Sequence, residues 1–358
     1  MKQRRGQVVE VRDLADFDER IGAGVASMAG WVLTGLDLSD RSAVLADASV
    51  AGAMFLGCAL APGVEATLEE RGAIVFPALP GAPVDPYRSS LYSPAELYDV
   101  TDYTGSLDAR SYAWSRETGR EALLARALHD HGIDTALAAW VAGRSLVGVM
   151  GGHAAQRGSE EYAAAARLGH GLAHTFTVAT GGGPGAMEAA NLGAWMAKRS
   201  LDELDEALAV VAGVPSFRPD IGAWAASAFE VRDRWPDGGE SLGIPTWHYG
   251  HEPPNPFATS IAKYFGNPVR EAILLQVCNA GIVFLPGAGG TVQEIFQDAC
   301  ENYYADASSV APMVLVGRSY WTETFPAWPL LEALARGRPM EPHVHLVDTV
   351  DEAIVLLG

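Results

Sequence analysis

The sequence predicts an α/β protein in which a Rossmann-like, doubly wound parallel sheet is joined to a smaller N-terminal domain. From about residue 121 onward, short apolar segments alternate with helical segments. This alternation is typical of a parallel sheet covered by helices on both faces. Two of the apolar segments also run directly into glycine-rich loops that precede helices, as in nucleotide-binding folds of this class.

The length of the chain favours two domains. Its 358 residues exceed what one hydrophobic core usually organises. We place the boundary near residue 120, with a small domain of unassigned role at 1–120 and the nucleotide-binding domain at 121–358. In the first part, apolar runs at 53–58 and 73–76 are separated by glycines and prolines, which predicts short strands and turns. Residues 36–40 are similar to a pentapeptide-type repeat, but the units are too few to predict a solenoid.

The composition constrains the partners. With 25 Lys+Arg against 44 Asp+Glu the net charge is -19, which repels nucleic acid and anionic membrane surfaces. A small anion can still bind backbone N–H groups at contact range, so we expect a mononucleotide-sized ligand. No apolar run is long enough for a membrane span, and no apolar segment follows the basic residues 1–6. The three cysteines form no CxxC pair. We therefore expect a cytoplasmic protein with no metal site and no bound cofactor.

The predicted elements of the second part follow one another closely. Helical residues begin near residue 120, and further helices are expected at 160–173, 186–198 and 202–211. Residues 201–240 are interpreted as an insertion that carries an aromatic stretch with Trp224, Phe229 and Trp235. Strands are expected at 145–150, 175–180, 242–249, 281–285, 312–316 and 344–347.

The first glycine loop lies between the second of these strands and a helix. It contains Gly181, Gly182, Gly183 and Gly185, and Met187 follows in the helix. Glycines let the backbone approach an anion closely, and a helix start directs N–H groups toward it. A tight turn that needs positive φ is the alternative interpretation. The spacing differs from the dinucleotide GxGxxG pattern.

The second glycine loop follows the strand at 281–285 and contains Gly287, Gly289, Gly290 and Thr291. Loops at the carboxyl ends of parallel strands converge on one crevice, so both loops together are more specific for a phosphate site than either alone. Thr291 is expected to cap the following helix and to offer its hydroxyl to a phosphate. The alternative is a helix cap with no further role.

These motifs make the sequence resemble the LONELY GUY family, cytokinin-activating phosphoribohydrolases once mislabelled lysine decarboxylases, and the longer bacterial relatives that cleave nucleoside 5′-monophosphates. The resemblance covers roughly residues 147–317. The first loop looks like the GGGPGxMEA version of the longer relatives, and residues 252–256 are similar to a segment of those nucleosidases. Ala288 replaces a family glycine. The family signature Pro-Gly-Gly-x-Gly-Thr-x-x-Glu, with an upstream arginine, matches Pro286, Gly287, Gly290, Thr291, Glu294 and Arg270.

Glu294 and Arg270 are the candidate catalytic residues. Cleavage of a ribosyl C1′–N bond builds positive charge on the sugar, and a nearby carboxylate such as Glu294 stabilises that charge or activates water. We place Glu294 in the first turn of its helix, where the helix dipole keeps it ionised near neutral pH. Arg270 is expected to bind phosphate or ribose oxygens. The alternatives are a capping box between Thr291 and Glu294, and an ion pair between Arg270 and a structural acid.

The sequence thus predicts a metal-independent hydrolase that releases free base and ribose 5-phosphate from a nucleoside 5′-monophosphate. The alternative is a non-catalytic nucleotide or molybdenum-cofactor carrier on the same scaffold. A pyridoxal-phosphate decarboxylase ranks lower because none of Lys2, Lys198 and Lys263 lies in a recognisable cofactor motif. The resemblance and the apolar helix at 269–277 lead us to expect a homodimer or higher oligomer. Asp298 and Glu301 are expected on a solvated helix face, and His153 and Arg157 near the nucleotide.

Overall fold

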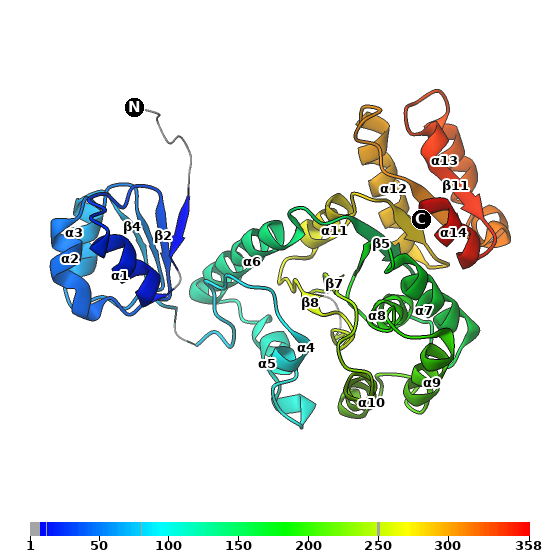
Figure 1. The fold of residues 1–358 in the computed structure, drawn as a ribbon, viewed down its shortest axis with the longest axis horizontal. Coiled ribbons are helices and arrows are strands. Elements are labelled where there is room, and N and C mark those ends of the chain that lie inside the picture. The colour runs from blue at the N-terminus through cyan, green and yellow to red at the C-terminus, as the bar shows by residue number, and fades with distance from the viewer. Residues whose placement is uncertain (1–7, 12, 80, 249–250) are drawn as a thin grey trace. The chain divides into compact units, whose positions relative to one another are not determined.

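The computed structural model describes residues 8–11, 13–79, 81–248 and 251–358 (Figure 1). The basic N-terminal residues and the last residue of the strand expected at 242–249 lie outside these ranges. The contacts divide the chain into two units, Met1–Ser89 with Thr118–Gly132, and Ser90–Glu117 with Ile133–Gly358. This division does not coincide with the boundary expected near residue 120. Residues 90–117 join the larger unit, where the backbones of Tyr92 and Ile261 exchange hydrogen bonds of 2.9 and 2.8 Å.

The larger unit is built on a seven-stranded sheet in which every paired strand is parallel. The strand order is β11-β10-β9-β5-β6-β7-β8. The chain therefore fills one side of β5 with β6 to β8 and then crosses to fill the other side with β9 to β11, as in a Rossmann-like doubly wound fold. The strands are β5 (Leu146–Met150), β6 (Thr177–Thr180), β7 (Ser241–Gly243), β8 (Ser260–Ile261), β9 (Ile282–Phe284), β10 (Met313–Val316) and β11 (Val344–Val347).

Helices cover both faces of this sheet because its central strands are apolar on both faces. Val147 and Val149 in β5 belong to a core cluster that also includes residues of α7, α8 and α14. Leu146 and Met150, which alternate with them, are equally buried but point to the other face. The helices are α7 (Glu160–Leu172), α8 (Ala186–Trp195), α9 (Leu201–Ala212), α10 (Ile221–Arg234), α11 (Asn267–Val277), α12 (Gly289–Tyr304), α13 (Trp328–Ala335) and α14 (Val350–Leu357).

Two elements differ from the sequence-based expectation. The strand expected at 242–249 ends at Gly243. Proline follows at 245, and the chain then leaves the sheet toward the cavity described below. The aromatic stretch in residues 201–240 is helical, since Trp224 and Phe229 lie in α10 and Trp235 is its C-cap residue. Trp224 and Trp235 are buried, so packing of these side chains attaches the segment 201–240 to the rest of the larger unit.

A buried polar cluster holds residues 90–117 against the rest of the larger unit. These residues contain α4 (Pro94–Leu97) and α5 (Leu107–Trp114). Asp108 accepts hydrogen bonds from Lys263 Nζ at 2.6 Å, Trp247 Nε1 at 2.8 Å and the Tyr103 hydroxyl at 2.7 Å. Lys263 and Asp108 are both fully buried. A buried charge needs a partner, so this ion pair makes the attachment specific. Lys263, one of the lysines considered for a cofactor, therefore serves this contact.

The smaller unit contains a four-stranded parallel sheet in chain order, β1-β2-β3-β4, with a helix after each of the first three strands. Register partners lie 22 residues apart between the first three strands, as for Val11, Leu33 and Phe55, and 20 residues apart between the last two. The smaller unit is thus built from stacked copies of one strand–helix segment. The sequence alone did not reveal this repeat. The elements are β1 (Val9–Val11), α1 (Leu14–Gly22), β2 (Trp31–Thr34), α2 (Ser42–Asp47), β3 (Met54–Leu56), α3 (Val64–Glu70) and β4 (Ile74–Phe76).

Helix α6 (Arg120–Val141) contains residues of both units. In the part of the chain that the structure describes, no helix combines the length and the apolar character needed to cross a membrane.

In the larger unit, α7 and α8 pack side by side (Figure 1). Small residues permit this approach. A Cβ atom added at Gly169 would overlap the carbonyl oxygen of Ala190, and one added at Gly193 would overlap that of Ala166. These obstacles are backbone atoms, which cannot move without separating the helices.

We predict that Gly193→Ala destabilises the larger unit by more than about 2 kcal/mol, because overpacking against backbone forces the helices apart. Urea unfolding monitored by circular dichroism measures the effect. Gly289→Ala is the matched control, since its Cβ would meet open space. Equal stability of the two variants would contradict the close-packing argument.

Candidate functional site

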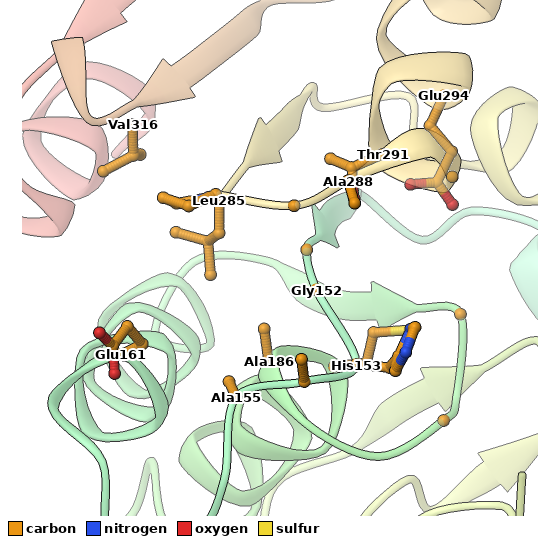
Figure 2. Close-up of a pocket in the computed structure, with 18 of the residues that line it drawn as sticks. Gly152, His153, Ala155, Glu161, Ala186, Leu285, Ala288, Thr291, Glu294 and Val316 are labelled. Atoms are coloured by element: carbon orange, nitrogen blue, oxygen red, sulfur yellow. The ribbon is translucent and has the colours of Figure 1, made fainter. Parts of the chain in front are cut away.

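The site lies where the strand order reverses between β5 and β9, the position at which open α/β sheets bind ligands. A cavity of about 1440 Å³ opens there. Its walls include residues after β5, both glycine loops, and the segments after β10 and β11. Figure 2 shows Gly152, which follows β5, close to the second loop with Leu285 and Ala288.

The second glycine loop leads into α12, which begins at Gly289. Ala288 is the N-cap residue, and no side chain caps the helix. Thr291 is therefore the third helical residue, so the expectation that it caps the helix is wrong, and so is the capping-box alternative for Glu294. Gly287, Gly289, Gly290 and Thr291 all line the cavity. The first N–H groups of a helix have no intrahelical acceptor, so this end of α12 offers donors to a ligand.

Glu294 also faces the cavity, but from the second turn of α12 and not the first (Figure 2). Burial raises the pKa of its carboxyl to about 7, Arg270 opposes this rise, and Glu271 adds to it. The expectation that the helix dipole keeps Glu294 ionised is therefore wrong. Desolvation outweighs the dipole because the dipole effect fades within the first turn. Near neutral pH, Glu294 can both accept and donate a proton.

Arg270 reaches the same cavity from the first half of α11, and its side chain is mostly buried. Its Nη2 donates a hydrogen bond of 3.2 Å to Asn267 Oδ1. The Glu271 carboxylate lies 3.9 Å from the guanidinium, so the expected alternative of an ion pair with an acid also has a counterpart in the structure. Arg270 Nη1 lies 3.6 Å from the place a Cβ on Gly181 would occupy, an ordinary van der Waals distance. Arg270 therefore lies beside the first glycine loop.

The first glycine loop contributes Gly181, Gly183 and the side chain of Met187 to the cavity, but not Gly182. Gly182 is buried, and its N–H donates to Thr180 Oγ1 at 3.0 Å. The backbone of Gly185 has φ 78°, and a Cβ there would lie 2.7 Å from the carbonyl oxygen of Gly152. Some glycines of this loop therefore form a tight turn, the alternative weighed from the sequence, and others border the cavity.

Asn255 supports this loop from behind and was not singled out by the sequence reasoning. Its N–H donates to Gly182 O at 2.8 Å, and its amide Nδ2 donates to Gly183 O at 3.2 Å and Asn191 Oδ1 at 3.0 Å. Its own Oδ1 accepts from the N–H groups of Phe257 and Ala258. The signal for this role was the family-like segment 252–256, in which Asn255 is fully buried.

His153 and Arg157, both expected near the nucleotide, have different positions. His153 is exposed on the cavity wall. Arg157 is buried and pairs with the buried Glu188, while its Nη1 donates to Ser227 Oγ at 2.8 Å. Arg157 therefore has a structural role behind the first loop. Burial raises the pKa of the Glu188 carboxyl, and the positive charge of Arg157 opposes this rise.

The charged residues of the described cavity wall are mostly acidic. It carries the carboxyl groups of five residues and the guanidinium groups of Arg218 and Arg270. Among the residues that the structure describes, no three histidine, cysteine or acidic side chains are grouped to hold a metal ion. The five acids are Glu161, Glu252, Glu271, Glu294 and Asp348.

Asp298 departs most from its expected position. It is 6% exposed, whereas a solvated face was expected, and only Glu301 is exposed. Burial, with a smaller contribution from Glu301, raises the pKa of Asp298 to about 8. Asp298 is therefore mostly protonated at neutral pH. Asp298 follows Glu294 by four residues, so both side chains lie on the same face of α12. The sequence pattern did not indicate that this face is buried at Asp298.

We predict that Asp298→Asn weakens the loss of stability as pH rises from about 4 to about 8. The pKa is raised in the folded state, so the unfolded chain ionises first and folding becomes less favourable across this window, by about 2–5 kcal/mol. Urea unfolding at about pH 5 and about pH 8 measures the slope. Glu301→Gln on the same helix should change the slope less, and a wild-type slope in Asp298→Asn would refute the assignment.

No protein-family model matches the chain, and no curated protein matches it. Solved structures with a similar fold include a molybdenum cofactor binding protein from the phototrophic bacterium Rippkaea orientalis, at 16% identity and a TM-score of 0.36, covering 60% of this chain and 96% of that chain. The molybdenum cofactor carrier protein of Chlamydomonas reinhardtii matches at 21% identity and a TM-score of 0.35, covering 60% of this chain and 95% of that chain. These likenesses concern the fold alone. The Rossmann-like class itself follows from the parallel strand order of the larger unit.

Proposed function

We propose that this cavity binds a nucleoside 5′-monophosphate and that Glu294 promotes hydrolysis of its N-glycosidic bond. The observation that carries the proposal is that both glycine loops, Arg270 and Glu294 line one cavity at the strand-order reversal. A buried carboxyl with a pKa of about 7 in such a cavity is typical of a general acid or base.

In this proposal the phosphate binds at the start of α12. The N–H groups of Gly289, Gly290 and Thr291 lie where the helix has no intrahelical acceptors for them. In the first loop, the N–H of Gly182 already bonds Thr180. The first loop therefore walls the sugar and base end, and the second loop receives the anion.

The proposed reaction adds water across the C1′–N bond. The water oxygen bonds to C1′ as the C1′–N electron pair leaves with the base, and Glu294 accepts a proton from the water. The leaving nitrogen gains one proton from solvent, and Glu294 afterwards releases its proton to solvent, so the products are free base and ribose 5-phosphate. The positive charge of Arg270 acts on Glu294 and lowers the pKa of its carboxyl. Arg270 can also orient phosphate or ribose oxygens.

The acidic wall favours a monophosphate over a longer phosphate chain. Five carboxyl side chains and two guanidinium groups line the described cavity. Each further phosphate would add charge that these carboxyl groups repel. Local N–H groups at one helix start can compensate a single phosphate more easily than three.

A second candidate function is binding of a larger phosphorylated ligand without reaction. The observation that favours it is volume: the cavity measures about 1440 Å³. Small-molecule sites usually enclose roughly 300–1,000 Å³. A molybdenum cofactor, which the two similar proteins above bind or carry, is a group of this kind. The residues fit such a group only in part, since the volume accommodates it while the acidic wall disfavours additional anionic groups.

We predict that Glu294→Gln abolishes hydrolysis of nucleoside monophosphates but preserves their binding, because it removes the titrating group and keeps the side-chain shape. A positioned acid or base typically supplies a factor of about 10² to 10⁴ in rate. Chromatography of released base measures turnover, and calorimetry measures binding. Glu301→Gln, an exposed change on the same helix, should retain activity. A variant that keeps more than about a tenth of wild-type turnover would refute the catalytic role, and binding without turnover by the wild-type protein would favour the carrier.

We also predict that AMP is hydrolysed faster than adenosine or ATP at equal concentration. The phosphate supplies binding energy that holds the sugar in reactive geometry, so its absence lowers turnover as well as affinity. The acidic wall makes ATP the poorer of the two nucleotides. Equal rates for AMP and adenosine would leave the second glycine loop as a turn with no phosphate role.

A further inference from the structure

Glu271 follows Arg270 in α11 and lines the same cavity, yet its carboxylate makes its short contacts with amides. Asn267 Nδ2 donates to Glu271 Oε1 at 2.7 Å, within α11. Gln293 Nε2 donates to Glu271 Oε2 at 2.7 Å, from the neighbouring helix α12. Both carboxylate oxygens are therefore held, and the Glu271 side chain is only 15% exposed. This carboxylate joins the two helices that carry Arg270 and Glu294.

The same contacts orient Arg270. Because Glu271 holds the amide nitrogen of Asn267, the opposite end of that amide, Oδ1, is turned toward Arg270 and accepts its hydrogen bond of 3.2 Å. The Arg270–Glu271 separation of 3.9 Å exceeds hydrogen-bond length, so Glu271 acts on the guanidinium mainly through Asn267. Gln293 immediately precedes Glu294 in α12. The hydrogen bond from Gln293 to Glu271 therefore ties α12 to α11 next to the candidate catalytic carboxyl.

We infer that Glu271 is a positioning residue, which holds Arg270 against α12 and places a second negative charge beside Glu294. This inference rests on the proposed function, because it assigns Glu271 a role in the same reaction. A carboxylate suits this role, since each of its two oxygens accepts from a different amide and the group carries a charge.

The charges around Glu294 give the inference a distinct signature. From α11, Arg270 lowers the pKa of Glu294 and Glu271 raises it. The buried Cys278 at the end of α11 has a raised thiol pKa, and Asp298 lies one turn further along α12 with a raised pKa. His153 and Glu252 line the same cavity. Removal of the charge on Glu271 should therefore lower the pKa of Glu294.

The test compares Glu271→Gln with Glu271→Asp and Gln293→Ala. Glu271→Gln removes the charge and retains one acceptor oxygen, whereas Gln293→Ala breaks the link between the helices and retains the charge. If ionised Glu294 is the active form, wild-type kcat/KM should fall as pH drops through about 7. Glu271→Gln should move this midpoint down by on the order of half a pH unit. Gln293→Ala keeps the contacts of Asn267 with Glu271 and Arg270, so the midpoint should stay in place. Loss of the link between α11 and α12 should raise KM for the monophosphate by about 3- to 10-fold.

A second readout does not depend on turnover. Carboxyl NMR of ¹³C-glutamate-labelled protein follows the titration of Glu294, which is assigned by its absence in Glu294→Gln. A lower midpoint in Glu271→Gln, with the wild-type midpoint retained in Glu271→Asp and Gln293→Ala, is expected. An unchanged midpoint in Glu271→Gln, or an equal shift in Gln293→Ala, would overturn the inference. If Glu271→Gln shows the lower NMR midpoint but the wild-type protein hydrolyses no nucleotide, the proposed function fails while the placement of Glu271 beside Glu294 stands.

Discussion

Backbone-to-backbone contact among three strand-ending turns is the constraint on which the site depends. The turn after β5 passes between the two glycine loops: Gly152 N donates to Pro286 O at 3.3 Å, and Gly152 O accepts from Ala186 N at 3.2 Å. Side chains at Gly185 or Gly287 would collide with this turn or with Thr291. Only residues without a Cβ allow three turns to meet there. The reversal of strand order between β5 and β9 brings these turns together, so the fold and the cavity have a common origin.

Behind this contact, buried polar groups hold each turn in place. Asn255 uses its backbone and its amide on the first loop, and the Arg157–Glu188 pair lies beneath the start of α8. Such groups are costly to bury unless all are satisfied, and when satisfied they specify one arrangement. The segment 252–256 thus acts as a brace for the first loop as well as a wall of the cavity through Glu252. The same chain continues to Lys263, whose ion pair with Asp108 attaches residues 90–117.

The electrostatics of the cavity depend on a competition between desolvation and local charge. In α12, burial raises the pKa values of Glu294 and Asp298, and one guanidinium, that of Arg270, opposes the rise at Glu294. A carboxyl that titrates near 7 can exchange a proton in either direction, which suits acid–base chemistry. The same acidic surroundings limit the anionic charge of a ligand. The volume of about 1440 Å³ and the acidic wall therefore bear differently on the two candidate functions.

Local patterns in the sequence were sufficient for the α/β class and for the elements around the loops. The strands ending at Met150 and Thr180 lie where apolar runs predicted them, because buried parallel strands are continuously apolar. The half-buried edge strand Val344–Val347 also lies where it was expected. The glycine loops after two of the strands likewise predicted from local sequence where the cavity lies.

The start of α12 at Gly289 depended on tertiary structure. Thr291 has the residue type of a helix cap, but the helix begins two residues before it. Burial of Asp298 and the amide contacts of Glu271 also depend on how α11 packs against α12. The repeat of the smaller unit appears only in the register of its strands. Spacing along the chain encodes local geometry, whereas desolvation and partner choice depend on residues distant in sequence, and these determine the protonation of Glu294.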